Sequence, residues 1–160
     1  MAIIKKDGVS VKIEEGYKKC KVVSCEFNDK KIVNGKVFEQ GYITFEMENG
    51  TSIKQYMLIA PWTTYLFYKL IKAIKGSDFN VYDEYEKFNM NELIGAEVII
   101  ELKVEIKNGG EYMNVTNAYN IEDGEIIIEH DRKLKEERYS EMEKNNMMSM
   151  EYINNKVDSL

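Results

Sequence analysis

The feature that most constrains the fold is a strict alternation of residue types between positions 97 and 107. Apolar residues occupy every second position, and the positions between them are mostly charged: Val98, Ile100, Leu102, Val104 and Ile106 alternate with Glu97, Ile99, Glu101, Lys103, Glu105 and Lys107. A period of two predicts a β-strand with one face on a core and the other toward solvent. Asn108-Gly109-Gly110 then predicts a tight turn into a last strand over residues 111–121.

Three earlier segments also have strand character. Residues 17–27 are rich in β-branched and aromatic residues, but their alternation changes phase, which predicts a β-bulge in mid-strand. Residues 42–47 alternate cleanly and place Ile43, Phe45 and Met47 inward. The turn residues Asn49-Gly50 then predict a hairpin onto a returning strand at residues 52–59.

Pro61 marks a change from strand to helical spacing. Between Trp62 and Lys75 an apolar stripe recurs at helical intervals, made up of Leu66, Leu70, Ala73 and Ile74. Gly76 is placed to end this helix. A short second helix is predicted near residues 90–94, ending at Gly95.

The chain is expected to divide into three parts. Residues 1–16 are expected to form a loosely held arm, residues 17–128 the folded domain, and residues 129–160 a helical or partly mobile tail. Two interpretations of the tail stay open. It is either a solvated helix, or a contact for a partner or a second copy through residues 130–157, where Met147, Met148 and Met150 suit irregular surfaces.

Composition excludes several classes of protein. The 160 residues are 44% hydrophobic, which is enough for one domain with a core and rules out disorder throughout. The longest apolar run, around residues 65–68, is broken by Lys69 and Lys72, so no segment approaches the roughly 20 apolar residues of a membrane helix. The first residues lack the apolar core of a secretory signal, so we expect a cytoplasmic protein.

Few residues are suited to catalysis or metal binding. Cys20 and Cys25 lie five positions apart in an extended segment, nominally on opposite faces, and are expected to be free thiols. His130 is the only histidine, and the sequence has no phosphate-binding glycine loop. Because no spacing singles out an acid/base pair, we expect no cofactor, no metal, no catalytic residue and no enzymatic activity.

Charge is distributed unevenly along the chain. The formal net charge is −6, yet residues 1–36 contain nine lysines against five acidic residues. Such lysines either gather in one basic groove or form a solvated strand edge, and the global sign does not decide between these interpretations.

The order of elements predicts a fold class. Three strands, a helix and two further strands, with a long loop after the first strand, match the layout of an OB-fold. This is a mainly β, five-stranded Greek-key barrel with a helix between strands 3 and 4. OB-folds bind oligonucleotides across strands 2 and 3 and the loops joining strands 1–2 and 4–5, although the fold alone does not prove the ligand.

Several short runs resemble a known family. These are residues 93–98 (Leu-Ile-Gly-Ala-Glu-Val), the turn at 108–110, residues 112–115 (Tyr-Met-Asn-Val), and Trp62 at the start of the middle helix. Together, between Tyr17 and Glu122, they resemble bacteriophage single-stranded-DNA-binding proteins found beside replication and recombination genes. The resemblance implies a phage-encoded OB-fold, in the host cytoplasm, that coats single strands during replication, recombination or repair. The end of the chain, residues 155–160, lacks the acidic tail and terminal aromatic residue of cellular single-strand binders, which argues against recruiting host repair partners in that way.

A candidate binding surface follows from this layout. Sequence-tolerant binding of single strands needs aromatic faces on which bases stack and lysines along the phosphate path. The candidates are Lys30, Lys31, Lys36 and Phe38 in the long loop, Tyr42 on the second strand, Lys54 and Tyr56 on the third, and Lys107 and Tyr112 at the last turn.

Each of these assignments has a structural alternative. Phe38 and Tyr56 could instead plug the barrel or cover an edge, and Trp62 is expected to pack the helix against the barrel mouth. Glu46 and Glu101 would repel phosphate if they faced the groove, so they are expected either to lie away from the strand path or to limit affinity.

Two functions of different classes remain. The main hypothesis is a non-enzymatic single-stranded-DNA-binding protein with little sequence preference, working beside replication or recombination proteins. The alternative is an OB-like adaptor that binds a protein, such as a replication component or a host-defence factor, through its acidic surface and methionine-bearing tail.

Overall fold

The computed structural model describes the backbone of residues 2–6, 9–10, 13–62 and 65–158, and the side chains of residues 13–62 and 65–147. The chain divides into two compact units, Met1–Gly124 and Glu125–Leu160, which we describe separately.

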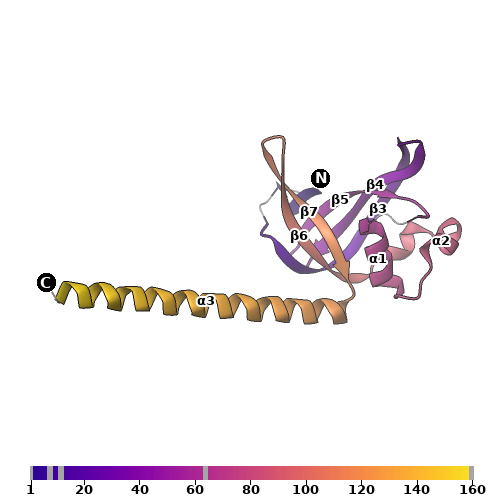
Figure 1. Ribbon diagram of the computed structural model, residues 1–160. Helices are drawn as coiled ribbons and strands as arrows, with labels where there is room; N and C mark the ends of the chain where they lie inside the picture. Colours follow the sequence, from indigo (N-terminus) through magenta and orange to yellow (C-terminus); the bar gives the residue numbers. More distant parts are fainter. Residues whose placement is uncertain (1, 7–8, 11–12, 63–64, 159–160) are drawn as a thin grey trace. The chain divides into compact units, whose positions relative to one another are not determined.

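The first unit is built on one antiparallel sheet with the strand order β2-β1-β5-β4-β3-β6-β7 (Figure 1). Its strands are β1 (Ala2–Lys6), β2 (Val9–Ser10), β3 (Gly16–Val33), β4 (Lys36–Met47), β5 (Thr51–Ile59), β6 (Glu97–Lys107) and β7 (Gly110–Tyr119). Among the described residues the edge strands β2 and β7 do not pair with each other, so the sheet is open. The prediction of a mainly β domain with five long strands is confirmed.

The N-terminal segment differs from the prediction. We expected residues 1–16 to be a loose arm, but β1 pairs with β5 from Ala2↔Gln55 to Lys6↔Thr51, and β2 pairs with β1. Because β1 and β2 precede the three predicted strands, the first long helix comes after the fifth strand of the chain. This fifth strand is the third of the long strands, as predicted.

The long loop predicted after the first strand is also absent from the described residues. Instead β3 and β4 stay paired up to Val33↔Lys36 and are joined by the two-residue turn Asn34-Gly35, whose φ angles are 51° and 77°. An Asn-Gly pair at positive φ forms the turn that best matches the twist of a hairpin, which explains why the strands continue.

Two irregularities bend β3. The predicted mid-strand bulge is confirmed by a register shift between Val22 and Ser24, and a second shift lies between Glu26 and Asp29. At the second one β3 passes so close to β4 that a Cβ on Gly41 would lie 2.0 Å from the carbonyl oxygen of Glu26. Bulges increase strand twist, so this long hairpin curls the sheet around its core.

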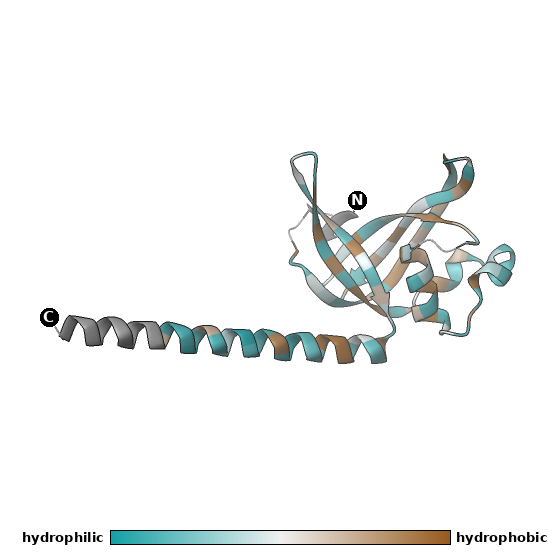
Figure 2. Ribbon diagram, in the orientation of Figure 1, coloured by the Kyte–Doolittle hydropathy of each residue, from teal (hydrophilic) through white to brown (hydrophobic). Residues whose placement is uncertain are grey.

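The core lies between the curled sheet and α1 (Tyr65–Lys75). Ile43, Phe45 and Met47 are buried as predicted, and Figure 2 shows the alternation of apolar and polar residues along the strands. On α1 the most buried residues are Phe67, Leu70 and Ile71, so the buried face is shifted from the predicted stripe, of which Leu66, Ala73 and Ile74 are only partly buried.

Three short helical elements connect α1 to β6: α2 (Val81–Glu84) and the 3₁₀ helices η1 (Tyr85–Lys87) and η2 (Met90–Leu93). The predicted helix near residues 90–94 is therefore a 3₁₀ turn. Tyr85 donates a hydrogen bond to Glu39 of β4, which ties this connection to the sheet.

The buried face of β6 is shorter than its alternation predicts. Leu102 is buried, but Ile106 is 75% exposed, because the pairing of β6 with β3 ends at Gly16↔Leu102. The rest of the strand belongs to the projecting β6–β7 hairpin. Ile99, predicted on the charged face, is buried because Gly124 packs on it so closely that an added Cβ would lie 2.5 Å from Ile99 Cδ1.

The helix α3 (Ile121–Asp158) begins directly after β7. The side chain of Asn120 caps it by accepting a hydrogen bond from the backbone nitrogen of Asp123 at 2.8 Å. The helix runs without interruption through the predicted boundary at residues 128–129. In the second unit, which begins at Glu125, the described residues all belong to this helix, and Lys135 and Asp131 form an ion pair at 3.0 Å. The side chains of Met148 and Met150 lie outside the described residues.

No helix in the described part of the chain combines the length and apolar character needed to span a bilayer.

Candidate nucleic-acid interface

The outward face of β4 and β5 carries two tyrosines side by side. Tyr42 and Tyr56 are directly opposite in the strand register, and their ring centroids lie 5.6 Å apart at an interplanar angle of 66°. Directly opposed residues of an antiparallel pair share one face of the sheet, and here this is the face away from the core. Both rings are half-buried, and the Tyr56 hydroxyl donates a 2.7 Å hydrogen bond to Gln40 Oε1.

A lysine is held over this pair. Lys54 Nζ lies 4.9 Å from the centroid of the Tyr42 ring and 3.2 Å from Glu26 Oε2. An ammonium group over an aromatic face is attracted by the ring quadrupole. Burial and the neighbouring Tyr42 raise the pKa of Tyr56, so the Tyr56 phenol is neutral around neutral pH.

A second aromatic pair lies further along β4. Phe38 meets Trp62 edge to face, with centroids 5.3 Å apart, and Lys36 Nζ lies 5.7 Å from the centroid of the Trp62 ring. Trp62 is 36% exposed. It lines the same groove as Phe38 and the first residues of α1. Two ring pairs, each accompanied by a lysine, therefore belong to β4, β5 and the segment that follows β5.

A groove of about 660 Å³ adjoins these rings where β5 and β7 approach without pairing. One wall comes from residues 55–58 of β5, the opposite wall from residues 114–116 of β7, and the ends from Phe38, Trp62 and the first residues of α1. The groove is thus lined by the same rings, Phe38, Tyr56 and Trp62, that form the outward surface.

The three lysines predicted for the loop do not share one face. Lys31 is opposite Phe38 and therefore on the aromatic side, as is Lys36 two positions before Phe38. Lys30 is opposite Glu39 and so points to the other face. Phe38, Tyr42, Lys54 and Tyr56 join Lys31 and Lys36 on the aromatic side.

Lys107 and Tyr112 belong to the tip of the β6–β7 hairpin, and neither lines the groove. The ring of Tyr112 lies over Gly110, where an added Cβ would be 3.1 Å from the Tyr112 hydroxyl. The structure therefore brings the β4–β5 candidates together and leaves these two on a separate hairpin.

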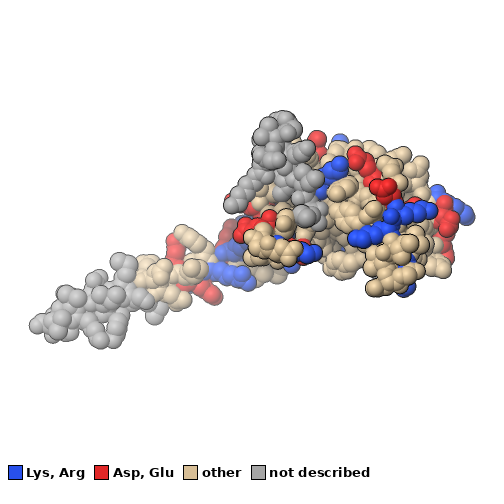
Figure 3. Space-filling model, turned by 90° about the horizontal axis from the view of Figure 1, so that it is seen from above, with Lys and Arg blue, Asp and Glu red and all other residues tan. Residues whose placement is uncertain are grey.

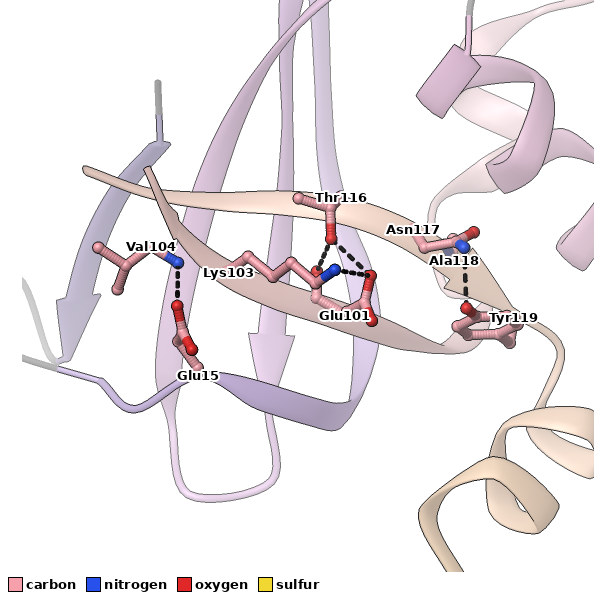
Figure 4. Close-up of polar contacts among 8 residues, drawn as sticks. All are labelled: Glu15, Glu101, Lys103, Val104, Thr116, Asn117, Ala118 and Tyr119. Atoms are coloured by element: carbon pink, nitrogen blue, oxygen red, sulfur yellow. Dashed lines mark hydrogen bonds and ion pairs between the residues drawn. The ribbon is translucent and has the colours of Figure 1, made fainter. Parts of the chain in front are cut away.

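Neither of the acidic residues expected to avoid the binding path lines the groove, but Glu46 shares the outward face of β4 with Tyr42, contrary to the expectation that it lies away from the path. Glu46 is exposed on β4, and Glu101 is largely buried on β6, where it accepts a 2.8 Å hydrogen bond from Thr116 Oγ1 and lies 3.8 Å from Lys103 Nζ (Figure 4). Glu15 is also engaged, accepting a hydrogen bond from the backbone nitrogen of Val104 at 2.6 Å. Figure 3 shows basic and acidic side chains interspersed on the face seen from above.

Most of the groove residues were not anticipated as site residues, and three of them matter for its chemistry. Tyr65 opens α1 and is exposed, whereas Gln55 and Asn114 are buried polar residues on the facing walls. Gln55 was detectable in the sequence, because it is a polar residue at an inward position of β5 between Ile53 and Met57. Nothing local marks Asn114, since its role depends on the approach of β7 to β5.

Metal ligands and reactive thiols are not part of this surface. The described residues contain no group of three or more histidine, cysteine, aspartate or glutamate side chains that could hold a metal ion. Both cysteines are free, and burial raises the pKa of Cys20 to about 12 and that of Cys25 to about 11, so both are protonated at neutral pH. Comparison of the chain with protein-family models and with curated proteins finds no match to either.

Proposed function

We propose that this chain is a non-enzymatic protein that binds single-stranded DNA with little sequence preference. The observation that carries the proposal is the outward surface formed by two aromatic pairs, Tyr42 with Tyr56 and Phe38 with Trp62, each with a lysine over one of its rings. Base stacking on aromatic side chains contributes about 1–3 kcal/mol per base and is tolerant of sequence, because every base has a π-face.

The geometry of the pairs suits this role. An edge-to-face pair leaves at least one ring face uncovered by its partner, and Trp62 is partly exposed. The lysines beside the rings would meet the phosphates that flank a stacked base. Because contacts to phosphate release counterions, binding should weaken with added salt.

We further propose that the first unit is an OB-type Greek-key barrel whose ligand lies across its second and third long strands. Two observations support this assignment. The first long strand, β3, lies between β4 and β6, so that β6-β3-β4-β5 follow the 4-1-2-3 order of a Greek key. Gln55 of β5 also hydrogen-bonds to β7 across the groove. The barrel and the surface fit the phage single-strand binders that the sequence resembles, and hence a role in replication, recombination or repair.

The test is a titration with oligothymidine at low and high salt, followed by the fluorescence of Trp62, which is the only tryptophan. Stacking at the proposed surface should quench this fluorescence, with an affinity that falls as salt rises. No binding at micromolar protein in low salt would overturn the proposal.

A second candidate function, a protein-binding adaptor, is favoured by one feature of the second unit. Apolar side chains of α3, among them Ile126, Tyr139 and Met142, are exposed, and exposed apolar side chains are common at partner contacts. Truncation after Ile128 tests whether DNA binding needs α3 and whether α3 joins copies of the chain. A single-strand binder should keep its affinity for oligothymidine, whereas a fall in solution mass beyond the lost residues would assign α3 to contacts between copies.

A further inference from the structure

The strands β5 and β7 face each other across a gap and do not pair. The pairing of β5 with β1 reaches only to Gln55↔Ala2, and β5 continues to Ile59 with no paired strand on that side among the described residues. The groove of about 660 Å³ occupies this gap, and its volume is in the range of small-molecule sites, about 300–1,000 Å³.

One wall of the groove contains a buried acceptor without a hydrogen bond. Asn114 is 9% exposed and lines the groove; its Nδ2 donates to Glu105 Oε2, but its Oδ1 is buried and has no partner in the described part of the chain. A buried acceptor left unpaired costs about 1–3 kcal/mol, so such groups are rare and call for an explanation. A ligand with an N–H group would satisfy it.

The amide of Gln55 on the facing wall is already engaged within the protein. Gln55 Oε1 accepts from the backbone nitrogen of Val115 at 2.8 Å, and Gln55 Nε2 donates to the carbonyl oxygen of Tyr56 at 3.0 Å. The side-chain amides of Gln55 and Asn114 thus have their nitrogens engaged within the protein. Asn114 Oδ1 is therefore the amide group left over on the two walls, and it is suited to a ligand that donates a hydrogen bond.

Much of the remaining lining is aromatic, beside aliphatic side chains such as Met57 and Leu58. Trp62 and the 65% exposed Tyr65 border the groove together with Phe38. Planar rings around a hydrogen-bonding group are the usual setting in which proteins read an unpaired base, which stacks on the rings and is recognised along its edge. This favours a nucleobase as the occupant.

We propose that this groove holds one unpaired base and that Asn114 Oδ1 accepts a hydrogen bond from its exocyclic amino group. The inference rests on the proposed single-strand function and refines it. Cytosine and adenine carry such an amino donor, whereas thymine and uracil present a carbonyl oxygen at the same place and have their N–H donor one position further along the edge of the ring. A carbonyl oxygen would face Asn114 Oδ1 and find Asn114 Nδ2 held by Glu105. The protein should therefore prefer amino-bearing bases modestly, at one position of the bound strand.

The test compares oligodeoxycytidine with oligodeoxyuridine of equal length, since their bases are similar in size and differ in the group that faces Asn114. The intact chain should bind oligodeoxycytidine about tenfold more tightly, as expected for roughly one hydrogen bond. Asn114→Leu, which keeps the shape of the side chain and removes its acceptor, should weaken oligodeoxycytidine binding, should not weaken oligodeoxyuridine binding, and should thereby abolish the preference.

Asn117→Ala is the matched control, because Asn117 is on the same strand, outside the groove, and should keep the preference. Should Asn114→Leu fail to fold, Asn114→Ala serves the same purpose. Equal binding of both oligonucleotides by the intact chain, or a preference that survives loss of Asn114, would overturn the base site and leave single-strand binding standing. Failure to bind either oligonucleotide would instead overturn the proposed function, and the base site with it.

Discussion

Gln55 accepts a hydrogen bond from the backbone nitrogen of Val115 across the gap between β5 and β7, at 2.8 Å. Both residues are buried. In a closed barrel this nitrogen would pair with the backbone of a neighbouring strand, but among the described residues β7 pairs only with β6. A single side chain therefore supplies the acceptor that the missing pairing would otherwise provide, and it connects the two walls of the groove.

Replacing Gln55 with leucine should destabilise the first unit. The variant leaves the buried N–H of Val115 without an acceptor, which costs about 1–3 kcal/mol of unfolding free energy. Urea denaturation measures the loss. Gln40→Leu is the control, because Gln40 accepts only from the hydroxyl of half-buried Tyr56, which can turn to water, and its cost should stay within about 0.5 kcal/mol. Equal losses of unfolding free energy in the two variants would contradict the proposed bridging role of Gln55.

Removing either outward tyrosine should weaken binding more than folding. We expect Tyr42→Ala and Tyr56→Ala each to cost about 1–3 kcal/mol of oligothymidine binding, because each removes a stacking surface. Affinity by fluorescence titration and melting temperature by circular dichroism separate the two effects. Tyr139→Ala, an exposed tyrosine of α3, should change neither quantity. A large fall in melting temperature with binding retained in the folded fraction would assign the two rings to structure.

The lysines of the β3–β4 hairpin should differ in effect according to the face they occupy. Lys31 and Lys36 are on the side of Phe38, so replacing both with glutamate should weaken oligothymidine binding and reduce the slope of log affinity against log salt by about 0.7 for each lost phosphate contact. Lys30→Glu changes the same hairpin on the opposite face and should have the smaller effect. If Lys30→Glu weakens binding as much as Lys31→Glu or Lys36→Glu does alone, the effect of a lysine does not depend on the face of the hairpin that it occupies.

Much of the fold could be predicted from local patterns, because alternation and turn chemistry act over a few residues. Asn49-Gly50 was recognised as a hairpin turn, since clean alternation flanks it. The same pair at 34–35 was missed, because the flanking lysines and asparagines resemble a loop, and pairing across the bulge at Glu26 is visible only in the folded sheet.

In the candidate site, too, some residues could be predicted from local patterns and others could not. Alternation identified Tyr42 and Tyr56, whose outward position depends only on strand parity. It could not identify Trp62 or Asn114 as neighbours of one groove, because that relationship depends on how closely β5, β7 and α1 approach. The prediction that Ile106 is a core residue is wrong for a related reason: its pattern is that of a core residue, but among the described residues only β7 pairs with that end of β6.

Gly41 should tolerate no side chain. An alanine Cβ there would lie 2.0 Å from the carbonyl oxygen of Glu26 and 2.7 Å from the ring of Phe27, so the bulged part of β3 would have to move. We expect Gly41→Ala to lower the unfolding free energy by about 1–3 kcal/mol or more. Gly110→Ala is the matched control, because its nearest contact is the Tyr112 hydroxyl at 3.1 Å, on a side chain that can turn aside. Similar melting temperatures for the two variants would contradict the close approach of β3 to β4.

The two thiols should make the first unit less stable in alkali. Burial raises the pKa of Cys20 to about 12 and that of Cys25 to about 11 from an ordinary value of 9.0. Above pH 9.0 the unfolded chain releases thiol protons that the folded chain retains, so unfolding becomes more favourable as the pH rises. Burial also raises the pKa of Tyr85, with the same sign at higher pH.

Urea denaturation at about pH 8 and about pH 10 should therefore show a lower unfolding free energy at the higher pH. Cys25→Ala removes one of the two thiols and should make this decline shallower, while Cys20 remains as the other source. In the native protein at about pH 8 both thiols should react slowly with a disulfide reagent, and both should react rapidly once urea exposes them, because the thiolate is the reactive form. Rapid labelling of the native chain, or a stability that rises with pH over this interval, would contradict the burial of these thiols.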